Sequence, residues 1–357
     1  MKFVCYADWR ELPASVEPLF RSAEKESLFF SKAWFENLLD HGFDEGQKLL
    51  LACVIEDERV LALLPLVEHG DKHGYPLKHL YTSLYKPLVD ENRQQLILSC
   101  LIEGLRRLPI RSLQLEPTAE DDADLLSLQR AMISNGFSCH RYFSFYNWFH
   151  PTNGQSFSDY MASRPSRVRN TVNRKQRKLQ REQNHRIQLF TDSHIDQALS
   201  DYRAVYNASW KANEVFEPFI EGLAKQLAKR GWLRLAILYI DNQPAAAQFW
   251  FVAHGKASIF KLAYDEAWKR YSPGTILLVY LMEQVIDRDR VEEIDFLTGN
   301  DAYKQDWMSQ RRQRWRLSCI DNNPLSEQRN NRANMLWKRL KSLLVKVYNG
   351  KFLPIQK

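Results

Sequence analysis

The sequence lacks any long uninterrupted apolar segment. Its longest apolar runs, such as Leu49 to Ile55, are far too short to span a bilayer. Near the N-terminus, Asp8 and Glu11 interrupt the apolar core that a secretory signal needs. We therefore expect a cytoplasmic protein, for which any contact with the inner face of the cytoplasmic membrane would be peripheral.

The patterns typical of metal sites and disulfide frameworks are also missing. No CxxC occurs, and the five cysteines are spread over positions 5, 53, 100, 139 and 319. This spacing predicts buried or free thiols in a reducing compartment. His69 and His73 have helix-like spacing, but they flank Gly70 and Gly74 in a turn. We expect no metal site and no permanently bound cofactor.

The composition is that of a globular protein. Apolar residues make up 45% of the 357 residues, aromatic residues 12% and charged residues 26%. The length suits two domains of ordinary size. The formal net charge is +7.

Two segments concentrate the positive charge. Residues 164–186 hold nine Lys or Arg residues and one acidic residue, with a narrow apolar stripe at Val168, Val172 and Leu179. This pattern predicts a helix that docks by one thin face. Its outer face has three interpretations. It is a solvated surface, or a site for donor phosphates or an anionic acceptor, or, as the less favoured interpretation, a nucleic-acid surface. Residues 329–357 hold eight Lys or Arg residues and no acidic residue, which indicates a tail helix that binds an anionic membrane or packs onto the domain.

Periodicity predicts an α/β chain with a mixed sheet. In the first half, strands are predicted at 48–56, 59–68, 77–85 and 111–116, helices at 92–108 and 123–135, and an edge hairpin at 138–149. In the second half, helices are predicted at 194–212, 218–230, 275–288 and 302–308, and strands at 233–241, 245–253, 258–264, 293–297 and 314–320. The two halves align as a weak internal repeat, which a duplicated α/β unit explains.

The most informative stretch joins a predicted strand to a long helix. A loop with cations follows the strand, and Ser-Pro-Gly-Thr opens the helix; the predicted donor loop is Arg270, Tyr271, Ser272, Pro273, Gly274 and Thr275. Ser272 or Thr275 can cap the helix, and Gly274 lets a ligand approach the backbone. Unpaired amides at a positive helix end suit a pyrophosphate, although an ordinary capped helix has the same pattern.

This stretch resembles the donor loop of GNAT-superfamily acyltransferases, in the branch with CelD-type and FemABX-like enzymes. Three further runs carry the resemblance, at 167–179, 208–211 and 293–307. The resemblance implies two tandem GNAT-like domains: a degenerate one at 1–150 and one with the donor site at 151–323, followed by the tail at 324–357. One departure is that Gly274 alone remains of the usual Gln/Arg-x-x-Gly-x-Gly/Ala loop.

The resemblance also implies roles for individual residues. A backbone N–H near Leu262, Ala263 or Tyr264 would hold the oxyanion, and Tyr303 would be the acid for the leaving thiolate. Candidate bases are Asp265, which we favour, Asp295 and Glu214. The substrate-binding candidates are Trp210, Lys211, Asp295 and Lys304.

The leading prediction is therefore an acyltransferase that moves an acyl group from acyl-CoA or acetyl-CoA, as co-substrate, to an amine. A lipid or envelope acceptor, such as a sphingoid base or an aminolipid, is favoured by the basic tail. One alternative is a FemABX-like transferase that uses aminoacyl-tRNA. Another is a non-catalytic binding component of a polysaccharide or lipid synthesis system.

Overall fold

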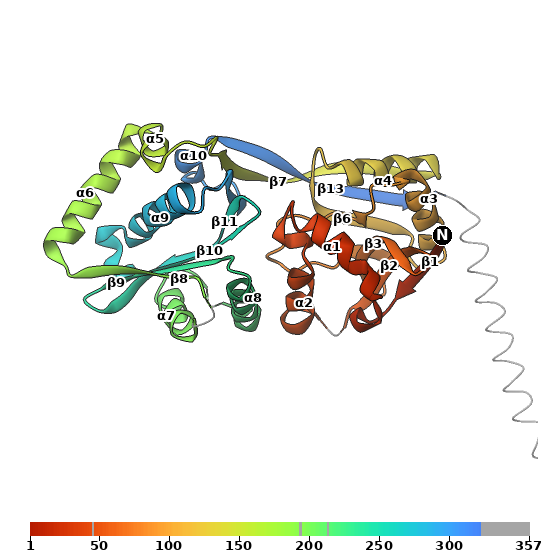
Figure 1. Ribbon diagram of the computed structural model, residues 1–357, viewed down its shortest axis with the longest axis horizontal. Coiled ribbons are helices and arrows are strands. Elements are labelled where there is room, and N and C mark those ends of the chain that lie inside the picture. The colour runs from red at the N-terminus through yellow and green to blue at the C-terminus, as the bar shows by residue number, and fades with distance from the viewer. Residues whose placement is uncertain (45, 193–194, 213, 323–357) are drawn as a thin grey trace, which may run out of the picture.

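The computed structural model describes residues 1–44, 46–192, 195–212 and 214–322. The predicted tail at 324–357 lies outside the described residues. Figure 1 shows two lobes side by side, with the N-terminal residues in one lobe and α6 at the far edge of the other. Among the described residues, no helix combines the length and the apolar character needed to cross a membrane.

Helices flank both lobes. Their bounds are α1 Glu17–Ala23, α2 Lys32–His41, α3 Gln94–Leu105, α4 Ala123–Ser134, α5 Phe157–Ala162, α6 Ser166–Glu182, α7 Asp196–Asn207, α8 Glu217–Lys229, α9 Pro273–Glu283 and α10 Lys304–Trp307. A 3-10 helix at Glu266–Tyr271 precedes α9, and a π-helical turn at Gln284–Arg288 extends it. The basic segment is the predicted helix, docked through buried Val168, Val172 and Leu179.

Strands form the centre of the molecule. Their bounds are β1 Lys2–Tyr6, β2 Lys48–Glu56, β3 Arg59–Glu68, β4 His73–Pro76, β5 Leu88–Val89, β6 Ser112–Ala119, β7 Phe137–Pro151, β8 His185–Phe190, β9 Leu233–Ile240, β10 Gln243–Ala253, β11 Lys256–Tyr264, β12 Glu293–Thr298 and β13 Gln310–Asp321. Most predicted strands are confirmed within a few residues, whereas β1, β4, β5, β8, α1, α2 and α5 were not predicted.

The strand order reveals the duplication. In the described part, one sheet runs β1-β2-β3-β4-β6-β13-β7-β12-β11-β10-β9-β8, and β5 pairs with β3. The two ends of this order mirror each other about β13 and β7. Each half has one parallel contact, β4 with β6 and β11 with β12, while its other neighbours are antiparallel. The predicted repeat is therefore visible as a pseudo-symmetric sheet.

Two long strands cross between the halves. The C-terminal end of β7 pairs with β12, and the C-terminal end of β13 lies between β6 and β7. Figure 1 shows β13 as a long arrow that reaches from one lobe into the other. The predicted edge hairpin at 138–149 is wrong, because this segment is one central strand. Alternating residues fit either arrangement, and the partners of β7 are far away in the sequence.

The predicted strand at 77–85 is also wrong. This segment is a loop between β4 and β5. Its backbone and side chains find single partners instead of a ladder, since the Tyr85 N–H donates to Pro117 O (2.7 Å) and its buried hydroxyl donates to Pro65 O (2.6 Å). An apolar run can be buried as a loop when such bonds satisfy its polar groups.

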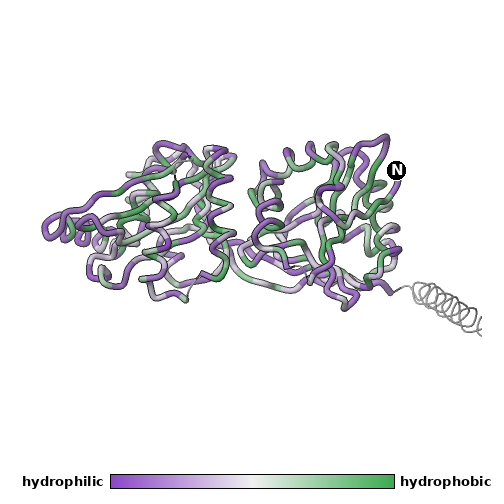
Figure 2. The backbone as a smooth tube through the Cα atoms, turned by 90° about the horizontal axis from the view of Figure 1, so that it is seen from below, coloured by the Kyte–Doolittle hydropathy of each residue, from purple (hydrophilic) through white to green (hydrophobic). Residues whose placement is uncertain are grey.

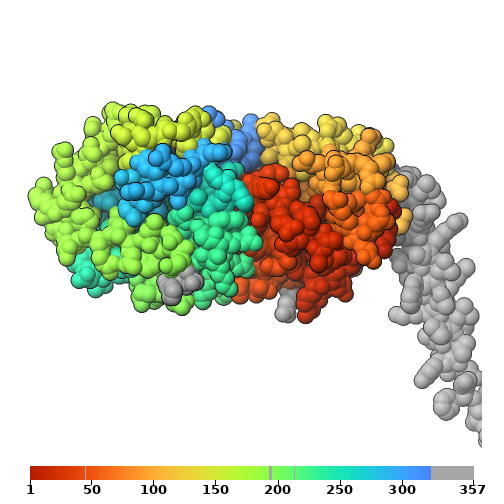
Figure 3. Space-filling model, viewed as in Figure 1, coloured from red at the N-terminus to blue at the C-terminus, as the bar shows by residue number. Residues whose placement is uncertain are grey.

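In the part of the chain that the structure describes, three apolar clusters hold the fold together. One lies under α3 and α4 in the first half and one under α6 and α9 in the second. The third combines both halves, with Trp34 of α2 and Phe219 of α8 in edge-to-face contact at 5.3 Å. In Figure 2, apolar segments run through the inside of both lobes, and Figure 3 shows the lobes meeting directly. The strand β7 runs through residue 150, and one apolar cluster contains residues from both sides of this position. The domain division at 150/151 therefore remains a proposal.

Candidate active site between two diverging strands

The parallel pair β11 and β12 stays together for only three residues. Lys256, Ala257 and Ser258 are in register with the first residues of β12, and beyond them the strands separate. β12 is also irregular at Leu297, which has a positive φ of 50° and is held by its N–H bond to the Asp295 carboxylate (2.6 Å). A left-handed conformation is unusual for leucine and is typical of a strand that has been re-aimed.

A cavity of about 480 Å³ lies where the strands diverge. Both strands line it, together with a loop of the first half and the segment after α7. Its lining residues are Leu80, Tyr81, Ser83, Trp210, Lys211, Ile259, Phe260, Lys261, Leu262, Phe296, Leu297, Thr298, Asp301, Tyr303 and Lys304. The volume is that of a small-molecule site. The site therefore combines residues from both halves of the chain.

Along the edge of β11 that faces this cavity, beyond its pairing with β12, some backbone N–H and C=O groups point away from β10. The Asp265 N–H donates to Ala245 O of β10 (2.9 Å), so the backbone of Asp265 is turned toward β10. Antiparallel pairs alternate, and Ala263 is therefore turned toward β10 as well. Leu262 and Tyr264 are turned to the other edge, toward the divergence. Among the three residues predicted for the oxyanion site, these two have the suitable orientation.

Two lysines bind carbonyl groups that the divergence exposes. The Lys211 Nζ donates to Leu262 O of β11 (2.5 Å), and the Lys304 Nζ donates to Thr298 O of β12 (2.6 Å). Both lysines belong to the residues predicted to bind substrate. Buried carbonyls without a ladder partner need such donors, so the lysines both maintain the divergence and place positive charge on the cavity wall.

A buried ion pair contributes to the wall of the cavity through its lysine. The Lys261 Nζ lies 2.6 Å from Glu214 Oε2, and the Tyr81 hydroxyl donates to the other Glu214 oxygen. Lys261 also lies 3.7 Å from the centre of the Tyr81 ring. The side chains of Lys261 and Glu214 are only 10% and 4% exposed. The cluster joins β11, the segment after α7 and the 77–87 loop, and so fixes the lobes on each other.

Burial changes the acidity of these groups. It lowers the pKa of Lys211 to about 8, and the charge of Lys261 contributes. Burial alone would raise the pKa of Glu214, but hydrogen bonds from Lys261 and Tyr81 bring it below its ordinary value. Burial also lowers the pKa of Lys261 although Glu214 opposes this. Among the described residues, Lys211 has a carbonyl but no carboxylate within ion-pair distance. Of these groups it is the one nearest to exchanging a proton at neutral pH.

Tyr303 lies at the mouth of the cavity. It caps α10, is 42% exposed, and its ring lies 5.9 Å from that of Phe296. Burial of the hydroxyl and the charge of Asp301 raise the pKa of Tyr303 to about 12. The hydroxyl therefore keeps its proton at neutral pH and can donate it.

The predicted donor loop lies at the C-terminal end of β11, next to the cavity lining. Ser272 is the N-cap residue of α9 in a left-handed conformation, but its hydroxyl makes no capping bond. The space above Gly274 is taken by Tyr264, whose Cδ1 would lie 3.2 Å from an added Cβ. The Tyr264 ring in turn lies 4.5 Å from the Trp210 ring. The lack of a side chain at Gly274 thus leaves room for the Tyr264 ring, and an aromatic contact links loop and cavity there. The approach of a ligand to the Gly274 backbone stays a prediction.

The basic helix α6 packs against this loop. The Lys175 Nζ donates to Arg270 O (2.6 Å), and Lys178 and Arg270 lie 5.4 and 4.8 Å from the centre of the Tyr271 ring. Arg174, Arg177 and Arg181 are exposed. The loop is thus surrounded by cations of α6 as well as its own.

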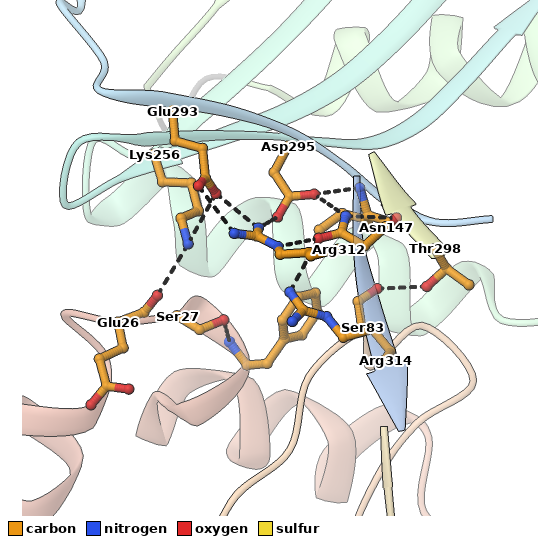
Figure 4. A network of polar contacts seen from close by, with 12 residues as sticks. Glu26, Ser27, Ser83, Asn147, Lys256, Glu293, Asp295, Thr298, Arg312 and Arg314 are labelled. Atoms are coloured by element: carbon orange, nitrogen blue, oxygen red, sulfur yellow. Dashed lines mark hydrogen bonds and ion pairs between the residues drawn. The ribbon is translucent and has the colours of Figure 1, made fainter. Parts of the chain in front are cut away.

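Asp265 and Asp295 lie outside the cavity lining. Asp265 accepts a bond from the Ala267 N–H (2.9 Å) and caps the 3-10 helix. Asp295 is buried and belongs to the network in Figure 4, where Arg312 binds it at 2.6 Å. Burial would raise the pKa of Asp295, but the Arg312 charge holds it below its ordinary value. The structure brings Leu262, Trp210, Lys211, Tyr303 and Lys304 together.

Sequence reasoning missed two cavity residues with distinctive chemistry, Tyr81 and Lys261. Tyr81 is in the segment wrongly predicted as a strand. Lys261 gave a usable signal, since a lysine in the apolar run Ile-Phe-Lys-Leu-Ala is rarely buried without a partner. Among the described residues, no group of three His, Cys, Asp or Glu side chains could hold a metal ion.

Residues 166–305 match the family model described as an acetyltransferase (GNAT) domain. The fold is GNAT-like. No curated protein matches the chain. The chain is similar to the solved structure of FemX (TM-score 0.61, 12% identity), with 92% of this chain and 99% of that chain covered.

Two further structures resemble the whole chain. One is the C-terminal domain of a putative lysylphosphatidylglycerol synthetase from Agrobacterium fabrum (TM-score 0.55, 12% identity, 91% of this chain and 98% of that chain). The other is a tandem GNAT protein from the clavulanic acid biosynthesis pathway (TM-score 0.50, 13% identity, 90% and 99%). The predicted GNAT-like fold with FemABX-like relatives is confirmed, and the family match supports a transferase.

Proposed function

We propose that the protein transfers an acyl group from a coenzyme A thioester to an amine, in the cavity between β11 and β12. The observation that carries this proposal is the divergence of these strands. The backbone groups of Leu262 and Tyr264 are turned away from β10, and Leu262 lines a cavity beside a cationic loop–helix junction. Backbone N–H groups fixed in this way are suited to an oxyanion, because they need no rearrangement during the reaction.

The donor would lie along β11 with its pyrophosphate near 270–275. Arg270 and the α6 lysines 175 and 178 supply the charge for the phosphates, as the contacts around Tyr271 support. Trp210 and Tyr264 would flank the thioester arm. Because Tyr264 covers Gly274, phosphate binding here would depend more on these cations than on an open glycine.

The acceptor would enter from the first-half side, past Tyr81 and Ser83. A wall with Lys211, Lys261 and Lys304 disfavours an ammonium ion and so favours the neutral amine that attacks the thioester. We assign the role of the base that accepts the proton of the amine to Lys211. Its pKa of about 8 leaves a fraction of this side chain uncharged at neutral pH. Glu214 would act by positioning Lys261. The predicted bases Asp265 and Asp295 lie outside the cavity lining.

The reaction then balances as a direct transfer. The amine nitrogen bonds to the thioester carbon, the carbon–sulfur bond breaks, and the leaving sulfur takes a proton from Tyr303. Lys304 would hold the β12 side of the site open. A lipid amine is the acceptor class that we favour, supported by the likeness to a putative lysylphosphatidylglycerol synthetase domain and by the predicted basic tail.

The test is amine-dependent release of free thiol. The full chain is incubated with acetyl-CoA or long-chain acyl-CoA and a panel of amines that includes a sphingoid base, and products are identified by mass spectrometry. We expect Tyr303→Phe to lower the rate by about 10²-fold. Tyr142→Phe, at an exposed tyrosine of β7, is the matched control and should leave the rate unchanged. The absence of amine-dependent release with every thioester would refute the proposal.

A second candidate is transfer from an aminoacyl-tRNA. The observation that favours it is the exposed cationic face of α6, with Arg174, Arg177 and Arg181. Binding of charged tRNA with a steep dependence on salt, together with tRNA-dependent product and no thioester turnover, would establish it. Turnover of either donor would exclude a purely non-catalytic role.

A further inference from the structure

The two strands that cross between the lobes carry one cysteine each. Cys139 of β7 and Cys319 of β13 are direct register partners in antiparallel strands. Their sulfur atoms lie 2.7 Å apart, although the residues are separated by 180 positions in the sequence. Directly opposite residues have Cβ atoms roughly 4.5–5.5 Å apart, which is near the span that a disulfide bridges. All five cysteines are free thiols in this structure.

We propose that Cys139 and Cys319 form a reversible oxidation site that converts two thiols into a cross-strand disulfide. Cys319 is fully buried between the strands, whereas Cys139 is partly exposed. An oxidant can therefore reach the first cysteine, and the second is already in contact to complete the bond. The proposal is independent of the transferase chemistry.

The hydrogen bond with Cys319 lowers the pKa of Cys139, which favours its thiolate. With hydrogen peroxide, the Cys139 thiolate attacks one oxygen, the O–O bond breaks, and a sulfenic acid and water result. The Cys319 sulfur then attacks the sulfenic sulfur, the S–O bond breaks, and a second water leaves. Two thiols and one peroxide give one disulfide and two waters.

The bond would close a long loop in the chain. The segment between the two cysteines contains α6, β11, α9 and β12, and so every residue of the cavity lining except those of the 77–87 loop. The disulfide would tie its two ends together where β13 lies between β6 and β7. A covalent link over such a separation restricts the unfolded chain strongly, so the oxidised form should be the more stable one.

The sequence contains its own control. Cys5 of β1 and Cys53 of β2 lie on neighbouring strands, but Cys5 pairs with Ala52 and Cys53 with Val4. They are one residue out of register, and they pack into the clusters on opposite faces of the sheet. Successive side chains alternate between faces, so these two cysteines cannot bridge. The sequence thus provides one aligned pair and one offset pair.

The experiment oxidises the full chain with hydrogen peroxide or with oxidised glutathione, blocks the remaining thiols by alkylation and maps peptides without reduction. We expect a linked peptide pair containing Cys139 and Cys319, two fewer alkylated cysteines, and reversal by a dithiol. The melting temperature should rise by roughly 5–10 °C on oxidation. The triple variant Cys5→Ser, Cys53→Ser, Cys100→Ser should keep the full effect.

Cys139→Ser should abolish the link and the temperature shift, and it changes only a partly exposed side chain. A Cys5–Cys53 link in place of the expected one would overturn the proposal. So would oxidation of Cys139 to the sulfinic acid without any link to Cys319. An unchanged melting temperature in a sample shown to be linked would overturn the predicted stabilisation.

Discussion

Lys211 gives the sharpest prediction, because its burial works against the stability of the fold. Its pKa falls from 10.5 to about 8 on folding, which corresponds to about 3 kcal/mol of unfolding free energy. The folded pKa is below the unfolded one. The penalty is therefore complete below about pH 8 and disappears as the pH rises toward 10.5.

We consider the variant Lys211→Met, which keeps the length of the side chain. It removes the penalty but also the hydrogen bond from Lys211 to Leu262 O. Leaving this carbonyl without a donor lowers the unfolding free energy by about 1–3 kcal/mol. Near pH 7 the variant should be more stable than the wild type by about 0–2 kcal/mol. Near pH 10.5 it should be less stable by about 1–3 kcal/mol. Thioester turnover should fall at every pH.

The assay is urea unfolding of both proteins at a series of pH values. The difference between them cancels the titration of all other groups. Lys229→Met, at an exposed position of α8, is the matched control, and its effect should stay small. A difference between Lys211→Met and wild type that does not change between pH 7 and pH 10.5 would show that the reasoning is wrong.

Three further predictions follow from buried contacts. Glu214→Gln leaves Lys261 buried without a charge partner and should lower the unfolding free energy by about 3–5 kcal/mol in urea unfolding. Adding Lys261→Met should restore part of this free energy. Strictly additive effects of the two substitutions on the unfolding free energy would contradict the pairing. Trp34→Ala should remove about 3–5 kcal/mol by opening a cavity in the core shared by both lobes, and a loss below 1 kcal/mol would contradict that packing. The contribution of Glu214 should disappear as the pH falls through its lowered pKa, which chemical denaturation at acidic pH measures against Glu214→Gln.

Much of the second half could be predicted from local pattern. The strands β9 to β12 and the helices α6, α8 and α9 follow from hydrophobic periodicity, and the duplication follows from their order. Trp210, Lys211, Tyr303 and Lys304 were chosen by resemblance, and they line one cavity. Local signals sufficed there because each element has its own apolar face.

Prediction failed where long-range partners decide the structure. The segment 138–149 alternates like an edge hairpin, yet β12 and β13 place it in the middle of the sheet. The resemblance made Asp295 a candidate base, which stays a prediction, but its ion pair with Arg312 of a distant strand is seen only in the structure. Neither outcome could be read from neighbours in the sequence.

The amino-acid sequence by itself determined that the chain is a duplicated α/β protein with a cationic loop–helix junction at 270–275. Periodicity and turn residues act over a few positions, so they are legible in the sequence. Only the tertiary structure decided what surrounds this loop and the cavity beside it. The divergence of β11 from β12, the closure of the cavity by Tyr81, and the cover of Gly274 by Tyr264 depend on which backbone groups lose their ladder partners and which distant side chains replace them.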